Sequence, residues 1–153
     1  MRKRYGVILA VIGCIVFFFC MEGWGADWKS LGKNDEYEFY LDTESITPSQ
    51  ENIFRVSVKA VFTDKGINRL VKLLGTEYKN LGHQVGLMEV NCSNKMILDL
   101  LSTFYSKGGG VLGSTHTGGK MRVSNKWEFI DPGSFNELLY QEICEDPKKI
   151  KAK

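Results

Sequence analysis

The segment Phe54-Arg55-Val56-Ser57-Val58-Lys59-Ala60-Val61-Phe62 decides the fold class. Apolar and polar side chains alternate along most of it, which is the pattern of a β-strand with one buried face and one face in water. Residues 37–41 alternate in the same way, and Thr47-Pro48-Ser49 between the two segments is a turn signal. The sequence therefore predicts an antiparallel hairpin.

Further strands are expected on both sides of this hairpin. Residues 85–92 and 95–105 are two apolar-rich runs joined by Ser93-Asn94, a connection short enough for a tight antiparallel turn. Residues 125–130 are interpreted as a last strand and residues 28–31 as a short first one. These segments together predict a mainly antiparallel sheet.

One stretch between the strands changes to helical spacing. Apolar residues recur at intervals of three and four from Ile67 to Tyr78. Asp64 is placed to cap the start of this helix, and Gly82 follows its end. We expect an inserted helix near residues 65–81.

A second helix is predicted at the C-terminal end of the domain. Pro132-Gly133 ends the preceding strand, Ser134 and Glu137 form a capping box, and Asp146-Pro147 stops the helix. Its apolar stripe consists of Phe135, Leu138, Leu139 and Ile143. The predicted class is thus α+β, with one antiparallel sheet and two helices.

The N-terminus predicts export. Residues 1–4 are basic, residues 6–20 are almost uninterrupted apolar residues, and small residues precede Ala26. We expect a signal peptide over residues 1–25, cleaved between Gly25 and Ala26, a mature domain over residues 26–147 and a basic tail over residues 148–153.

Two other fates of the N-terminus stay open. Val11-Ile12-Gly13-Cys14 resembles the lipobox of bacterial lipoproteins, in which Cys14 would be acylated, although the greasy run after it is unusual for a lipid tether. An uncleaved anchor is the other alternative, although about fifteen apolar residues are fewer than the roughly twenty that span a bilayer. Contact with a membrane is therefore expected only through the export signal or a lipid anchor.

The predicted export determines which bond the remaining cysteines are expected to form. Cys92 and Cys144 are the two that remain after residue 25, and in an oxidising compartment such a pair is expected to form a structural disulfide. Cys144 falls in the last turn of the predicted C-terminal helix, and Cys92 shares a strand face with Met88 and Val90. A bridge between them would hold the helix against the apolar face of the sheet.

The charge of the mature chain excludes one class of partner. The full chain has 20 Lys and Arg and 18 Asp and Glu; residues 1–25 hold three basic residues and one acidic residue, which leaves 17 of each sign. No basic stripe interleaved with aromatic residues is present, so nucleic acid is not an expected partner. The dense positive charge at residues 148–153 is interpreted as a solvated terminus.

The sequence contains no catalytic signature. His83 and His116 are the only histidines, both in glycine-flanked stretches, and no compact set of metal ligands is evident. Gly108, Gly110 and Gly113 match a phosphate-binding spacing, but the residues after them do not open a helix, so a hairpin loop is expected. We predict no enzyme, no metal and no cofactor.

A series of short motifs resembles a known family. The motifs are Trp28-Lys29, Tyr40-Leu41-Asp42-Thr43-Glu44-Ser45-Ile46, Arg55-Val56-Ser57-Val58-Lys59, Met88-Glu89-Val90-Asn91-Cys92, Tyr105-Ser106-Lys107-Gly108-Gly109, Trp127-Glu128-Phe129-Ile130-Asp131-Pro132-Gly133-Ser134 and Cys144. In order and spacing this series resembles the bacterial surface-adhesin protein E family. The resemblance implies a curved sheet of about six strands, a C-terminal helix tied to its concave side by the cysteine pair, and an envelope location.

The same resemblance frames the functional hypotheses. A member of that family is an adhesin for host matrix proteins, so we expect a non-catalytic exported protein, in the periplasm or at the cell surface, that binds a protein or a surface polymer. Dimerisation through sheet edges or faces is a further expectation. The alternatives are a periplasmic structural or assembly accessory and an enzyme or small-ligand carrier, which would need a deep pocket between sheet and helix.

The aromatic residues suggest where contact would occur. Six are assigned to the core, namely Trp28, Trp127, Phe39, Phe54, Phe62 and Phe135, whereas Tyr37, Tyr40, Tyr78 and Tyr105 are candidate binding anchors because tyrosine joins an apolar ring to a polar tip. The predicted contact surface is the polar face of the hairpin. It consists of Glu38, Tyr40, Arg55, Ser57 and Lys59.

Overall fold

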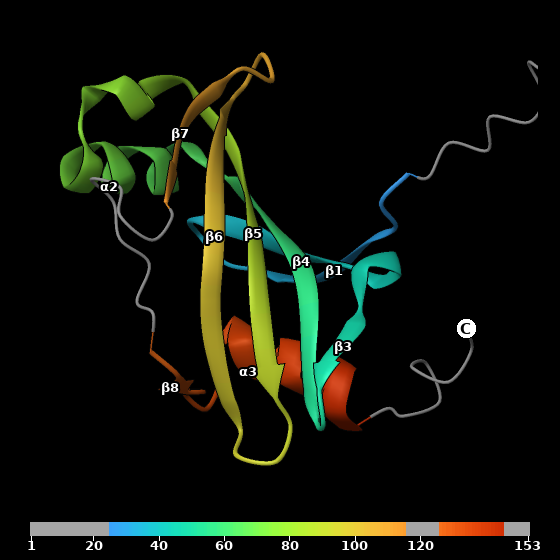
Figure 1. Cartoon of the computed structure of the whole chain (residues 1–153). Coiled ribbons are helices and arrows are strands. Elements are labelled where there is room, and N and C mark those ends of the chain that lie inside the picture. Colours follow the sequence, from blue (N-terminus) through green and yellow to red (C-terminus); the bar gives the residue numbers. More distant parts are fainter. Residues whose placement is uncertain (1–24, 116–125, 146–153) are drawn as a thin grey trace, which may run out of the picture.

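The computed structural model describes residues 25–115 and 126–145 (Figure 1). The predicted signal segment up to residue 24, His116, Asp146-Pro147 and the basic tail lie outside the described residues. Sequence predictions about them are therefore not addressed by the structure.

One antiparallel sheet forms the body of the described chain. Its main path follows the order β1-β2-β4-β5-β6-β7, while β3 pairs with β4 and β8 pairs with β6. The strands are β1 Trp28–Lys33, β2 Tyr37–Asp42, β3 Thr47–Gln50, β4 Ile53–Phe62, β5 Leu81–Asn91, β6 Met96–Ser106, β7 Val111–Thr115 and β8 Glu128–Phe129. In Figure 1, β1 and β2 cross behind the long strands β4, β5 and β6, which shows how strongly the sheet curves.

The predicted hairpin is confirmed, with its turn in a different place. β2 pairs with β4 from Tyr37 opposite Phe62 to Leu41 opposite Val58. The turn predicted at residues 47–49 is wrong, because these residues form the edge strand β3, in which Pro48 is tolerated. The chain turns instead at Glu51 and Asn52, where Asn52 adopts a left-handed conformation with φ of 57°.

The inserted helix is confirmed in place but is shorter than predicted. Helix α2 spans Asp64–Leu74, and its cap is Thr63, whose hydroxyl accepts from the amide of Gly66, rather than the predicted Asp64. Gly75 has φ of 123°, a conformation that a side chain would oppose, and it ends the helix. A 3-10 helix, η2 Thr76–Asn80, follows and brings Tyr78 back to the apolar side.

Helix α2 packs over one end of the sheet. Its apolar side joins a second core cluster in which the buried residues are Ile67, Tyr78, Leu81 and Phe104. On its other side, Lys65 pairs with Asp35 at 2.7 Å and Arg69 with Glu36 at 2.7 Å. The helix is thereby fastened to the turn between β1 and β2.

The C-terminal helix begins as predicted. Helix α3 spans Phe135–Tyr140 and continues as a π-helical segment, η3 Gln141–Glu145. The hydroxyl of Ser134 accepts from the amide of Glu137, and the carboxylate of Glu137 accepts from the amide of Gly133 at 2.7 Å. The two side chains therefore cap the helix, with the Glu137 bond shifted by one residue from the usual capping box.

The main core lies between α3 and the sheet, where Leu139 and Ile143 are fully buried against strand residues such as Leu41, Val56 and Val90. Figure 1 shows α3 behind the long strands, in the hollow of the curved sheet. We refer to this side, which α2 also covers, as the concave face, and to the opposite side as the convex face.

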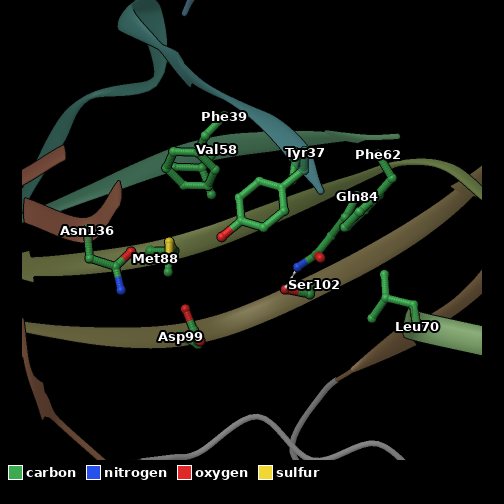
Figure 2. A pocket seen from close by; sticks show the side chains of 12 residues that line it. Tyr37, Phe39, Val58, Phe62, Leu70, Gln84, Met88, Asp99, Ser102 and Asn136 are labelled. Atoms are coloured by element: carbon green, nitrogen blue, oxygen red, sulfur yellow. Dashed lines mark hydrogen bonds between the residues drawn. The ribbon is translucent and has the colours of Figure 1, made fainter. Parts of the chain in front are cut away.

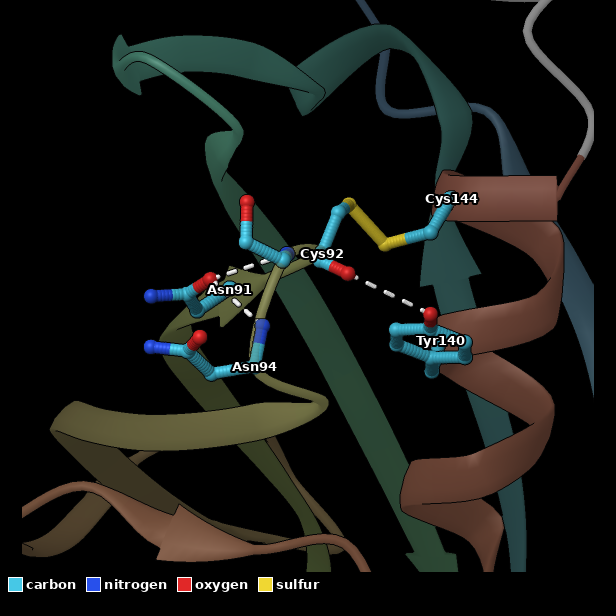
Figure 3. The surroundings of a disulfide bond; sticks show 6 residues. Asn91, Cys92, Asn94, Tyr140 and Cys144 are labelled. Carbon is cyan, nitrogen blue, oxygen red and sulfur yellow. Dashed lines mark hydrogen bonds between the residues drawn. A yellow bond between two sulfur atoms is a disulfide. The ribbon is translucent and has the colours of Figure 1, made fainter.

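A disulfide closes this arrangement, as predicted. Cys92, which directly follows β5, is bonded to Cys144 in η3, with Cα atoms 5.5 Å apart (Figure 3). The hydroxyl of Tyr140 donates to the carbonyl of Cys92 at 3.3 Å, and Lys95 pairs with Glu137 at 2.8 Å. The turn between β5 and β6 is thus held to the C-terminal helix by a covalent bond, a hydrogen bond and an ion pair.

Candidate binding surface

The two faces of the sheet differ because the strands alternate. On β4 the side chains of Val56, Val58 and Ala60 are buried on the concave face, whereas Arg55 and Val61 are exposed on the convex face. Both α-helices of the described chain pack on the concave face. No α-helix among the described residues packs on the convex face.

The five residues predicted to form a contact surface do share this face. Tyr40 lies directly opposite Lys59, and Glu38 lies opposite Val61. Arg55 and Ser57 precede Lys59 at alternate positions of the same strand. The structure brings the five residues together on β2 and β4.

Trp28 belongs to the same surface, although the sequence assigned it to the core. The ammonium group of Lys59 lies 4.3 Å from the centre of the Trp28 ring and 5.0 Å from that of Tyr40. On β1, Ser30 lies opposite Tyr40, so Trp28, two residues earlier, projects from the same face. Four residues of predicted strand were too few to show which way Trp28 points. Cation–π contacts of this kind contribute about 0.5–1 kcal/mol at exposed sites.

Hydrogen bonds reinforce the ordinary protonation states of Glu38 and Tyr40. The hydroxyl of Tyr40 and that of Ser30, which lies 2.9 Å from the carboxylate, lower the pKa of Glu38. The same bond to Glu38 raises the pKa of Tyr40. At neutral pH the surface therefore presents a carboxylate beside a protonated phenol.

The positive charges of this surface are not equivalent. Arg55 donates to the buried carboxylate of Glu89 at 2.7 and 3.2 Å, so its charge is offset. Within residues 25–115 and 126–145, Lys59 contacts rings and forms no salt bridge. The uncompensated cation at the centre of the surface is Lys59.

Apolar groups extend the convex face towards β6. The rings of His83 and Tyr105 stack with centres 4.9 Å apart, and Val61 and Leu101 are 40% and 38% exposed. His83 lies within β5 rather than in the turn-like stretch predicted, and burial, together with the charge of Lys59, lowers its pKa. An open hollow of ≈ 380 Å³ runs between Lys59, His83 and Lys107.

The other predicted anchors have different places. Tyr78 is buried in the second core cluster, and Tyr37 packs against Phe62 and Phe135 on the concave face. The glycine-rich stretch forms the predicted hairpin loop, but Gly113 already lies in β7, a strand that the sequence did not predict.

The concave face is only partly filled by α3. Phe135 and Leu139 pack against the sheet, Leu138 is 40% exposed, and a groove of ≈ 230 Å³ remains between α3 and α2 (Figure 2). The groove is a place in the structure where a small ligand could bind, as the small-ligand hypothesis requires. Among the described residues there is no group of three His, Cys, Asp or Glu side chains arranged to hold a metal.

Comparison with known families identifies this architecture. The sequence profile of surface-adhesin protein E matches residues 28–145, which covers the sheet, both helices and both cysteines. The chain belongs to the surface-adhesin protein E family. Membership places it among adhesin-like surface proteins.

Solved structures of the family share the fold. Structures of Haemophilus influenzae protein E superpose with a TM-score of 0.52 at 18% identity, covering 78% of this chain and 84% of that chain, and with a TM-score of 0.50 at 17% identity, covering 80% and 97%. At such identities the likeness concerns the fold alone.

Two further observations complete the comparison. No curated protein matches the sequence. Over the described residues, no helix combines the length and apolar character needed to cross a bilayer.

Proposed function

We propose that this family member is an exported, non-catalytic envelope protein that binds a protein or a surface polymer through its convex face. The observation that carries the proposal is that both helices lie on the concave face, which leaves the residues around Lys59 open. The proposed mature domain spans residues 26–147, after cleavage between Gly25 and Ala26, and is followed by the basic tail.

The composition of the convex face supports a contact role. Tryptophan, tyrosine and arginine are the residues most enriched at the energetic centres of interfaces, and Trp28, Tyr40 and Arg55 lie together here. Lys59 already contacts the rings of Trp28 and Tyr40, and Glu89 already pairs with the Arg55 side chain. Because these side chains are ordered before binding, less conformational entropy is lost on contact.

The binding test uses the oxidised mature protein against immobilised matrix proteins and envelope polymers. We expect Lys59→Glu to weaken binding to whichever surface captures the wild type by about tenfold or more, because it replaces the uncompensated cation by an anion. Lys72→Glu, the same charge change on the exposed side of α2, is the matched control and should bind as the wild type does. Equal binding by the two variants would remove the convex face from the proposal.

A second experiment tests exposure and processing. Mass spectra of the exported protein should show that it begins at Ala26. Protease added to intact cells should cleave the protein if it acts as an adhesin. Protection from the protease would favour the periplasmic accessory role instead, and a lipid on Cys14 would replace the proposed cleavage site.

A further inference from the structure

A groove crosses the concave face in the space that α3 and α2 leave between them. Its volume is ≈ 230 Å³. Apolar side chains from β2, β4 and β5 form most of its floor, and Tyr37 and Phe62 add aromatic rings. Ligand pockets usually measure about 300–1,000 Å³, so this groove suits a short chain or a single ring.

Strand β6 places a carboxylate in this groove, directly before a break in strand register. Leu87 lies opposite Leu101, but Met88 lies opposite Asp99, so Leu100 is an extra residue in β6. Asp99 lies two residues after the buried Ile97, so ordinary alternation places it on the concave face, and the extra residue lets Ser102 face the same side. The bulge adjoins the groove, and bulges are frequent beside active sites.

Among the described residues, no basic side chain compensates the charge of Asp99. Asp99 is the only charged residue among those that line the groove in the described chain, and the described residues give it no salt bridge or hydrogen bond. Burial raises the pKa of Asp99, and the nearby Glu128 raises it further. A partly buried carboxylate beside a second carboxylate makes this site attractive to a cation.

Other polar groups lie within reach of the same space. Figure 2 shows the hydroxyl of Tyr37, the carboxylate of Asp99 and the amide of Asn136 turned towards the middle of the groove. Gln84 and Ser102 are already engaged, since the Gln84 amide donates to the Ser102 hydroxyl at 2.8 Å. The free polar tips are therefore an anion and two hydrogen-bonding groups above an apolar floor.

We propose that this groove binds a small organic cation, with a primary ammonium group at Asp99 and a short apolar body over Phe39 and Met88. The hydroxyl of Tyr37 and the side-chain carbonyl of Asn136 accept further hydrogen bonds from the ammonium group. The site lies on the face opposite the convex surface, so it does not rest on the function proposed above.

The test compares three ligands of similar shape by titration followed in amide NMR spectra of the oxidised mature protein. The probes are 2-phenylethylammonium, the neutral 2-phenylethanol and the anionic 3-phenylpropionate. We expect the ammonium compound to shift the amides of Gly86, Met88 and Asp99 and to bind at least tenfold more tightly than the alcohol. The anion should produce no shift at these positions.

Two variants test whether Asp99 causes the preference for the ammonium compound. Asp99→Asn keeps the shape of the side chain and should abolish the preference for the ammonium compound, whereas Asp35→Asn, at the turn between β1 and β2, should preserve it. Equal affinity for the three probes, or shifts confined to residues outside the groove, would overturn the proposal.

Discussion

Asp99 and Lys59 show how a charged side chain is placed by the strand that carries it. Lys59 follows the alternation of β4 and reaches the convex face, where aromatic rings hold it. Asp99 lies on β6 directly before a bulge and faces the concave side together with the buried Ile97. The alternating pattern predicted the position of Lys59 from sequence. The position of Asp99 could not be predicted, because apolar residues lie on both sides of it in the run Ile97-Leu98-Asp99-Leu100-Leu101 and give no alternation.

The pH dependence of stability tests the position of Asp99. Its pKa is raised above the ordinary value of 3.8 by burial, so between that value and the higher folded-state value the folded protein holds more protons than the unfolded chain. The free energy of unfolding should therefore fall as the pH rises through this window. Asp99→Asn removes this loss and should be more stable than the wild type above the window, as measured by urea unfolding between pH 3 and 7.

The opposite sign is expected at an exposed ion pair. Lys65 lowers the pKa of Asp35 in the folded protein. The pair therefore stabilises the fold at pH values above the pKa of Asp35 in the unfolded chain, and this stabilisation is lost as the pH falls. Asp35→Asn should therefore change the pH profile in the reverse direction and only slightly, because the pair is exposed. A constant difference between wild type and Asp99→Asn at every pH would contradict the burial of Asp99.

Gly66 tests the contact between α2 and the turn before β2. A Cβ atom at this position would overlap the backbone carbonyl of Glu36. Gly66→Ala should therefore destabilise by about 1–3 kcal/mol, although alanine favours helices by about 1 kcal/mol. Gly108→Ala, where the nearest atom would be 3.9 Å away, should change stability by less than about 0.5 kcal/mol in the same urea experiment. A stabilised Gly66→Ala would contradict this packing.

Among the elements, α3 was the most predictable and β3 the least. The capping pair Ser134 and Glu137 and the buried Leu139 follow from local sequence rules. In β3, Pro48 signals a turn, yet pairing with β4 keeps the segment extended. Strand β7 was not predicted for a similar reason. Its glycine content indicates a loop, but pairing with β6 holds the segment extended.

Adjacent leucines test the packing of α3. Leu139 is fully buried against the sheet, whereas Leu138 is 40% exposed. Leu139→Ala should reduce the free energy of unfolding by about 2–5 kcal/mol, because it leaves a cavity in the main core. Leu138→Ala makes the same chemical change and should cost clearly less. Equal losses in denaturant unfolding would show that α3 is not seated as described.

At the scale of the whole molecule, the disulfide joins the last described element to the middle of the sheet. Cys92 and Cys144 are 52 residues apart. Removal of such a bond in a small exported domain costs about 2–5 kcal/mol. The double variant Cys92→Ala, Cys144→Ala should lose stability in this range by urea unfolding. Reduction of the wild type should reproduce the loss and add the mass of two hydrogen atoms. A double variant as stable as the oxidised protein would contradict the role given to the bond.

The sequence was most informative at this scale. The antiparallel sheet, the helix over its apolar face and the cysteine pair were predicted, since alternation, capping and cysteine count are properties of the chain itself. That this face is concave was implied by the family resemblance. The composition of the surface was less predictable, because Trp28 joins Tyr40 and Lys59 only after β1 pairs with β2. The predicted homodimer remains a prediction, and sedimentation of the mature protein would measure it.

The most direct test of the central claim is site-specific photo-crosslinking on intact cells that bind an immobilised partner. A photoreactive p-benzoylphenylalanine replaces Tyr40 on the convex face or, as the control, Leu73 on the exposed side of α2, which is 69% exposed. The account predicts a covalent adduct with the partner from position 40 and none from position 73. An adduct from position 73 alone, or bound cells without any adduct from position 40, would contradict it.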